Sequence, residues 1–185
     1  MHAILQLWLP IVATAVLIFI ASSLIHMVFK WHNKEYGQFS NEDEIRAAIN
    51  AGKPAIGQYV LPHCLDMKDM QNEAMQHKFL EGPIGFITLR PNGPPKMGGS
   101  LLKWFIFSLA LAAFCAVLAV QVLGLEADSH RAGHLIGMTS FLAYSAGSVQ
   151  QGIWMGKPWS SVAKDILDGF IYGTISALTF MWLWP

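Results

Sequence analysis

Asp168 is the residue of this chain whose position most strongly suggests chemistry. It falls about one and a half turns inside a long apolar segment, where an ionised carboxylate is costly unless it is paired. His26 and Gln151 fall at a similar depth in two other apolar segments, so we take them as candidate partners in an intramembrane polar site. Such a site would favour proton or small-solute movement past Asp168. The alternative is that Asp168 lies in the membrane interface and stabilises a helix N-terminus.

Two histidines one helical turn apart suggest a metal site at the opposite end of the apolar segments. His130 and His134 have the spacing that lets two imidazoles bind one metal ion from a single helix face. Because a metal site usually has three or four ligands, two interfacial histidines without a metal are the alternative. Haem is a related hypothesis, but His26 and His134 fall at opposite depths and cannot ligate one haem together.

A third cluster, in a polar segment, is rich in the soft ligands that suit Cu(I). It consists of His63, Cys64, Met67, Met70 and His77. Methionines at helical spacing are also typical of an apolar helix face, so packing without a metal is the alternative. We expect no cofactor, and copper or haem is the alternative.

The sequence lacks the motifs of common enzyme classes. It contains no GxSxG nucleophile elbow, no glycine-rich phosphate loop with Lys and Ser or Thr, and no HExxH. Its 12 basic and 12 acidic residues balance, which gives no basic field for nucleic acid. We therefore expect a protein that is not an enzyme and does not bind nucleic acid.

Four long apolar segments must position these residues. We expect transmembrane helices in residues 1–29, 104–124, 132–154 and 163–184, since each is long enough at ~1.5 Å per residue to cross ~30 Å of hydrocarbon. A cleaved signal peptide is the alternative for the first segment, although no basic region precedes it. The predicted fold class is an all-α membrane protein, a four-transmembrane-helix bundle.

Basic residues near the ends of these segments indicate the orientation. Arg131 is the one basic residue on its side, whereas the other side carries Lys30, Lys34, Lys96, Lys103, Lys157 and Lys164. The positive-inside rule then places residues 30–103 in the cytoplasm and both termini outside. The expected location is the inner (cytoplasmic) membrane of a bacterium.

Residues 30–103 are predicted to form a small α+β insert between the first two helices. A helix is expected from Ser40 to Gly52, where a capping residue and a terminal glycine bracket an apolar face. Residues 57–61 and 85–89 are short extended runs closed by prolines, so we expect them to pair as strands. A second helix is expected between the strands, at residues 68–80.

Small residues follow one face of the third and fourth apolar segments. Gly133 and Gly137 form a GxxxG pair, and Gly169 and Ser176 continue the pattern in the last segment. Such faces permit close packing of helices in a membrane. They favour a non-enzymatic accessory, assembly or scaffold component that packs in a homo-oligomer or a larger membrane complex.

Several short motifs, spread over most of the chain, together resemble those of bacterial four-span membrane proteins that are described as hypothetical or uncharacterised. The motifs are Gly57-Gln58-Tyr59 with Pro62, Gly82-Pro83-Ile84-Gly85 with Thr88, Gly93-Pro94-Pro95 with Met97-Gly98, Gly156-Lys157-Pro158-Trp159, Asp168-Gly169 and the terminal Trp182-Leu183-Trp184-Pro185. The resemblance implies a four-span membrane protein. It implies no reaction and no site residue.

Overall fold

The computed structural model describes residues 5–185, which form two compact units. The helical unit comprises the chain up to Glu35 together with Lys96–Pro185, and the insert unit comprises Tyr36–Pro95. The insert unit lies within the predicted segment 30–103. Residues 30–35 and 96–103, on either side of it, belong to the helical unit.

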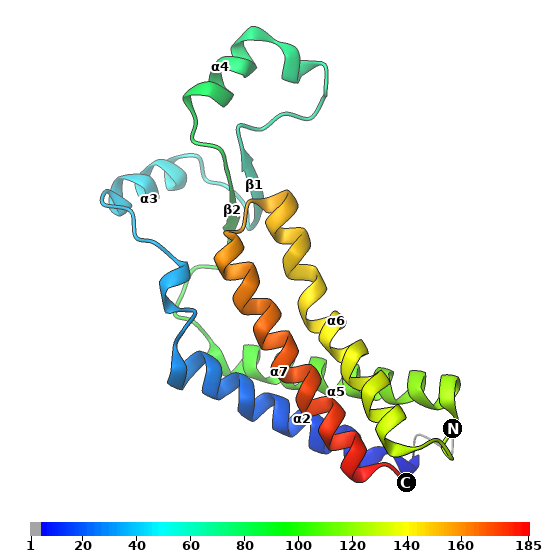
Figure 1. Cartoon of the computed structure of the whole chain (residues 1–185). Helices are drawn as coiled ribbons and strands as arrows, with labels where there is room; N and C mark the ends of the chain where they lie inside the picture. Colours follow the sequence, from blue (N-terminus) through cyan, green and yellow to red (C-terminus); the bar gives the residue numbers. More distant parts are fainter. Residues whose placement is uncertain (1–4) are drawn as a thin grey trace. The chain divides into compact units, whose positions relative to one another are not determined.

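Long helices make up the helical unit (Figure 1). They are α2 (Trp8–Ser23), which continues as the π-helical turn η1 (Leu24–Phe29), α5 (Met97–Leu123), α6 (Ser129–Met155) and α7 (Trp159–Leu183). Three stretches are long and apolar enough to cross a membrane, namely Trp8–Phe29, Met97–Leu123 and Trp159–Leu183. Helix α6 is as long as α5 but richer in Gly, Ser and Gln, so four spans stay a prediction.

Helices α5, α6 and α7 begin before the predicted spans. Helix α5 begins at Met97, two residues after the last proline of the Pro91–Pro95 segment, rather than at residue 104. Helix α6 begins at Ser129, because the side chain of Asp128 accepts hydrogen bonds from the backbone N–H groups of His130 and Arg131. Helix α7 begins at Trp159, directly after Pro158.

Glycines bring α6 and α7 into close contact along their length (Figure 1). A Cβ atom on Gly173 would lie 2.8 Å from the carbonyl oxygen of Gly137, and one on Gly169 would lie 2.9 Å from the Cβ of Ser145. Contacts this short leave no room for a side chain, so the two backbones touch. Helix α2 packs against both α5 and α7.

The insert unit contains a two-stranded antiparallel sheet and two short helices. Strands β1 (Gly57–Leu61) and β2 (Gly85–Leu89) have the predicted bounds, and Gly57 pairs with Leu89. Helix α3 (Glu42–Ala51) precedes the sheet, and the 3-10 turn η3 (Asp69–Gln71) and helix α4 (Glu73–Glu81) lie between the strands. No residue of α3 or α4 is buried, as expected for a unit too small to form a large core.

Candidate functional site

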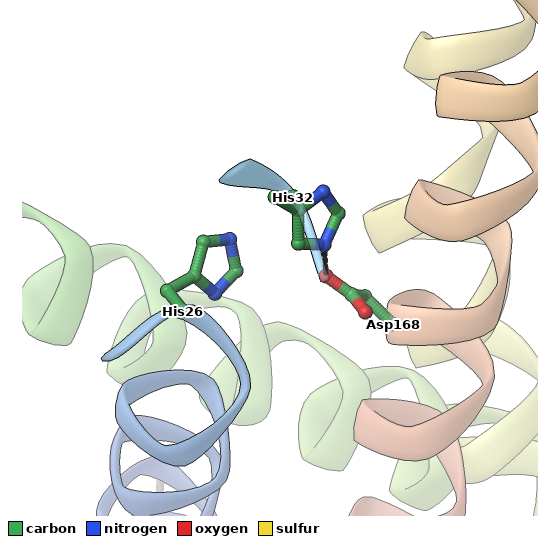
Figure 2. Close-up of side chains that lie close together, drawn as sticks. All are labelled: His26, His32 and Asp168. Atoms are coloured by element: carbon green, nitrogen blue, oxygen red, sulfur yellow. Dashed lines mark hydrogen bonds and ion pairs between the residues drawn. The ribbon is translucent and has the colours of Figure 1, made fainter. Parts of the chain in front are cut away.

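Asp168 is buried in the helical unit and is hydrogen-bonded to a histidine. It lies on α7 nine residues from the start of the helix, about 14 Å along its axis. The residue is 6% exposed. Its Oδ2 atom lies 2.9 Å from Nε2 of His32, a contact that is drawn as a dashed line in Figure 2. Its Oδ1 atom is buried and has no hydrogen-bond partner among residues 5–185, so half of the hydrogen-bonding capacity of this carboxylate is unused.

His32 reaches Asp168 from a tight turn that follows the first long helix. Lys30 has φ of 53°, in the left-handed region, which ends η1. The 3-10 turn η2 (Asn33–Glu35) then places Oε1 of Glu35 2.7 Å from Nδ1 of His32. Both ring nitrogens of His32 therefore contact carboxylates.

Proton counting defines the charge of this Glu35–His32–Asp168 chain. Each of its two hydrogen bonds needs one proton, because an ionised carboxylate can only accept. A neutral imidazole carries one of these protons, and the second is shared between His32 and the carboxylates, so the three groups together carry one net negative charge. Lys164 adds a positive charge, since its Nζ lies 3.4 Å from Oε1 of Glu35 and donates to the carbonyl oxygen of Trp31 at 2.7 Å. The lysine therefore balances the charge of the three groups, which is how buried charges are tolerated.

His26 stacks on His32 from the end of the first long helix. The ring centroids are 4.8 Å apart and the planes differ by 7°, and Figure 2 shows His32 between His26 and Asp168. Nδ1 of His26 lies 2.9 Å from the carbonyl oxygen of Ser22. Because a carbonyl can only accept, Nδ1 carries the proton, and Nε2 of the neutral ring keeps a free lone pair.

A second carboxylate lies one helical turn from Asp168. Asp165 accepts hydrogen bonds at Oδ2 from the Nζ of Lys157 and the hydroxyl of Ser148. Lys157 lies in the turn between α6 and α7, and Ser148 lies on α6. Asp165 therefore ties the two helices together near that turn.

A cavity of about 620 Å³ lies among α2, α5, α6 and α7 beside this cluster. Polar side chains from α2, η1, α6 and α7 line part of the cavity wall. Aromatic rings line the side formed by α5. The polar residues include Ser22, His26, Ser148, Gln151, Asp165 and Asp168. Trp104 lines the aromatic side and donates its Nε1–H to the hydroxyl of Ser22 at 2.8 Å. The site thus joins a buried ionic cluster to a space large enough for a small ligand.

Two overlapping sets of side chains in the cluster have the composition of a metal site. One is His26, His32 and Asp168, and the other is His32, Glu35 and Asp165. In each set, the candidate ligand atoms lie within 4.8 Å of one another. Both sets combine imidazole nitrogen with carboxylate oxygen, and such ligands suit divalent transition metals.

The structure brings together the residues predicted for the intramembrane polar site. His26 and Asp168 belong to one cluster, and Gln151 lines the same cavity. The hydrogen-bond partner of Asp168 is nevertheless His32, which the sequence interpretation missed together with Glu35. His32 and Glu35 follow His26 closely along the chain, just past the end of an apolar segment, and this closeness could have indicated them as further members of the site.

The structure does not assemble the other predicted ligands in the same way. His130 and His134 are exposed on α6, and neither joins a group of three His, Cys, Asp or Glu ligands among residues 5–185.

Two of the soft-ligand residues of the insert unit make other contacts. Cys64 donates to the carbonyl oxygen of Asp66 at 3.2 Å, while His77 contacts Glu81 at 3.1 Å. Within the described part of the chain, His63, Cys64 and His77 belong to no group of three His, Cys, Asp or Glu ligands. The exposed fractions of Met67 and Met70 are 78% and 40%, so they form no buried apolar helix face either.

Comparison of the chain with protein-family models, curated proteins and solved structures found no match in any of the three.

Proposed function

We propose that this protein binds a small polar solute or ion within its helix bundle and moves it past Asp168. One observation carries the proposal: Asp168 is buried deep in an apolar helix, hydrogen-bonded to His32, and lines a cavity of about 620 Å³. Ionisable groups inside a membrane are costly, and where they persist they typically mark substrate or ion pathways. A helix-stabilising role in the interface would require neither the cavity nor the paired histidine.

We also propose that α6 is a fourth membrane span, with both termini outside and the insert unit in the cytoplasm. Its 27 residues extend about 40 Å, which exceeds the thickness of the hydrocarbon layer. It packs along α7 from Gly133 to Gly152, so a membrane-spanning α7 would hold α6 in the bilayer as well. Its serines at 140, 145 and 148 are buried against neighbouring helices, which explains how a less apolar helix can be accommodated.

A scaffold or assembly role in a homo-oligomer or a larger membrane complex is the second candidate. The small-residue faces on α6 and α7 suggested this role. Gly133, Gly137, Gly169 and Gly173 contact the opposite helix within the chain, however, and these contacts require no external partner. Purification in mild detergent tests this candidate, because a monomer without a co-purifying protein would argue against it.

Flux measurements in liposomes test the proposed movement. Proton flux under an imposed potassium diffusion potential, and uptake of Co²⁺ by a trapped fluorescent chelator, are measured for the native protein, Asp168→Asn and Glu126→Gln. Glu126 is an exposed carboxylate in the loop before α6, so it is a matched control for the loss of one charge. We expect Asp168→Asn to reduce at least one flux to the level of empty liposomes and Glu126→Gln to leave both unchanged. Equal fluxes for the native protein and Asp168→Asn would refute the proposal.

A further inference from the structure

We infer that His26, His32 and Asp168 together bind one divalent first-row transition-metal ion at the edge of the cavity. The inference rests on the proposed function, because it names the ion that the same intramembrane site takes. The three side chains come from η1, the turn after it and α7, so the packing of the first long helix against α7 brings Asp168 to the two histidines (Figure 2).

The composition of the site selects the class of metal. Two imidazole nitrogens and one carboxylate oxygen suit ions such as Zn²⁺, Fe²⁺, Co²⁺ or Mn²⁺, and three ligands leave coordination positions open toward the cavity. Calcium and magnesium prefer oxygen ligands throughout, and Cu(I) prefers sulfur. A small molecule or water in the cavity would complete the coordination.

Small movements of the side chains would close the site around an ion. Ligand atoms bound at about 2.1 Å in a tetrahedral site lie about 3.4 Å from one another. His32 Nε2 and Asp168 Oδ2 are 2.9 Å apart, so this pair must open slightly. The ligand atom of His26 lies within 4.8 Å of the other two, so a small shift of this exposed side chain brings it to bonding distance of the same ion.

Outer hydrogen bonds already engage the Nδ1 atom of both histidines. The carbonyl oxygen of Ser22 fixes the proton of His26 on Nδ1, and the carboxylate of Glu35 does the same for His32. Nε2 is therefore the atom that each ring offers to an ion, and carboxylate or carbonyl groups behind the ligands are the usual support of metal-binding histidines. An ion replaces the proton in the His32–Asp168 hydrogen bond, so each ion bound releases one proton.

The competing set of His32, Glu35 and Asp165 is less available to a metal. Asp165 binds Lys157, and Glu35 lies 3.4 Å from the ammonium group of Lys164. A metal there would have to displace two ammonium groups. Asp168 has no lysine among its hydrogen-bond and ion-pair partners in residues 5–185, and its Oδ1 atom is unsatisfied.

Equilibrium metal binding by the full-length protein in detergent tests the inference. The protein is stripped with a chelator and titrated with Co²⁺, whose visible absorption reports nitrogen and oxygen ligation, and then with Zn²⁺ in competition. We expect one ion per chain, and affinity about tenfold or more lower in His26→Gln and in Asp168→Asn. His130→Gln, which removes an exposed histidine outside the cluster, should bind as tightly as the native protein.

His26→Gln tests the inference even if Asp168→Asn fails to fold, because replacing an exposed side chain should not prevent folding. Absence of Co²⁺ binding to the native protein, or equal affinity in His26→Gln, would overturn the inference. The proposed function is tested separately. Asp168-dependent proton flux without metal binding would refute the metal site and leave the proposed pathway standing. Metal binding without any flux would refute the pathway and leave the metal site standing.

Discussion

Replacing Gly137 by alanine should separate α6 from α7. The added Cβ would lie 2.7 Å from the Cβ of Ala177 and 3.0 Å from the carbonyl oxygen of Gly173. Carbon atoms pack best at about 3.5–4.0 Å, so the shortfall against Ala177 is about 1 Å. Neither neighbour is the end of a flexible side chain. The helices themselves must therefore move apart, and the contacts on either side loosen.

The size of the effect follows from two opposing contributions. Overpacking of a well-packed interior costs roughly 1–3 kcal/mol in the free energy of unfolding. Alanine also favours the helix over glycine by up to about 1 kcal/mol, which offsets part of that cost. Gly147→Ala isolates this second contribution, because a Cβ at Gly147, on the same helix, meets nothing within 4 Å. Gly137→Ala should therefore be less stable than Gly147→Ala by about 1–3 kcal/mol.

Unfolding by sodium dodecyl sulfate in mixed micelles, followed by helical circular dichroism and tryptophan fluorescence, measures this difference. Gly173→Ala should behave like Gly137→Ala, since its Cβ would lie 2.8 Å from the carbonyl oxygen of Gly137. If Gly137→Ala proved as stable as Gly147→Ala, the close α6–α7 packing described above would be refuted.

The same unfolding measurement checks two further changes. His32→Ala leaves the buried carboxyl group of Asp168 without its hydrogen-bond partner and should cost about 3 kcal/mol, whereas His26→Ala, at an exposed position, should cost less than about 1 kcal/mol. Equal losses would contradict the described burial of the His32–Asp168 pair. Trp104→Phe removes the hydrogen bond to Ser22 that joins α5 to α2 and should cost roughly 0.5–1.5 kcal/mol; unchanged stability would show that this bond contributes nothing.

Local signals predicted the secondary structure well. The two strands have the predicted bounds because short apolar runs closed by Pro62 and Pro91 leave little choice of register or length. The helix expected at residues 40–52 appears as Glu42–Ala51. Helices α5, α6 and α7 begin earlier than the predicted spans, because an apolar segment marks the part that fits the hydrocarbon and a helix continues beyond it.

The candidate site was only half predictable. Asp168 and His26 were identified because a polar residue in an apolar segment is costly and therefore conspicuous. His32 and Glu35 were missed because they follow such a segment, in an irregular turn where hydropathy and periodicity carry no signal. The left-handed conformation of Lys30 directs that turn, and a lysine gives no sequence indication of a positive φ.

The sequence by itself determined the long apolar helices, the strand pair and the uneven distribution of lysines, because hydropathy, turn residues and charge are properties of short segments. Only the tertiary structure decided which polar groups meet. His32 and Asp168 are 136 residues apart, and their contact depends on how α2 packs against α7 and on where the chain turns after η1. His130 and His134 have the spacing of metal ligands along the chain, but no third ligand joins them among the described residues. A metal site needs ligands from separate elements, and helix packing rather than sequence spacing brings such ligands together.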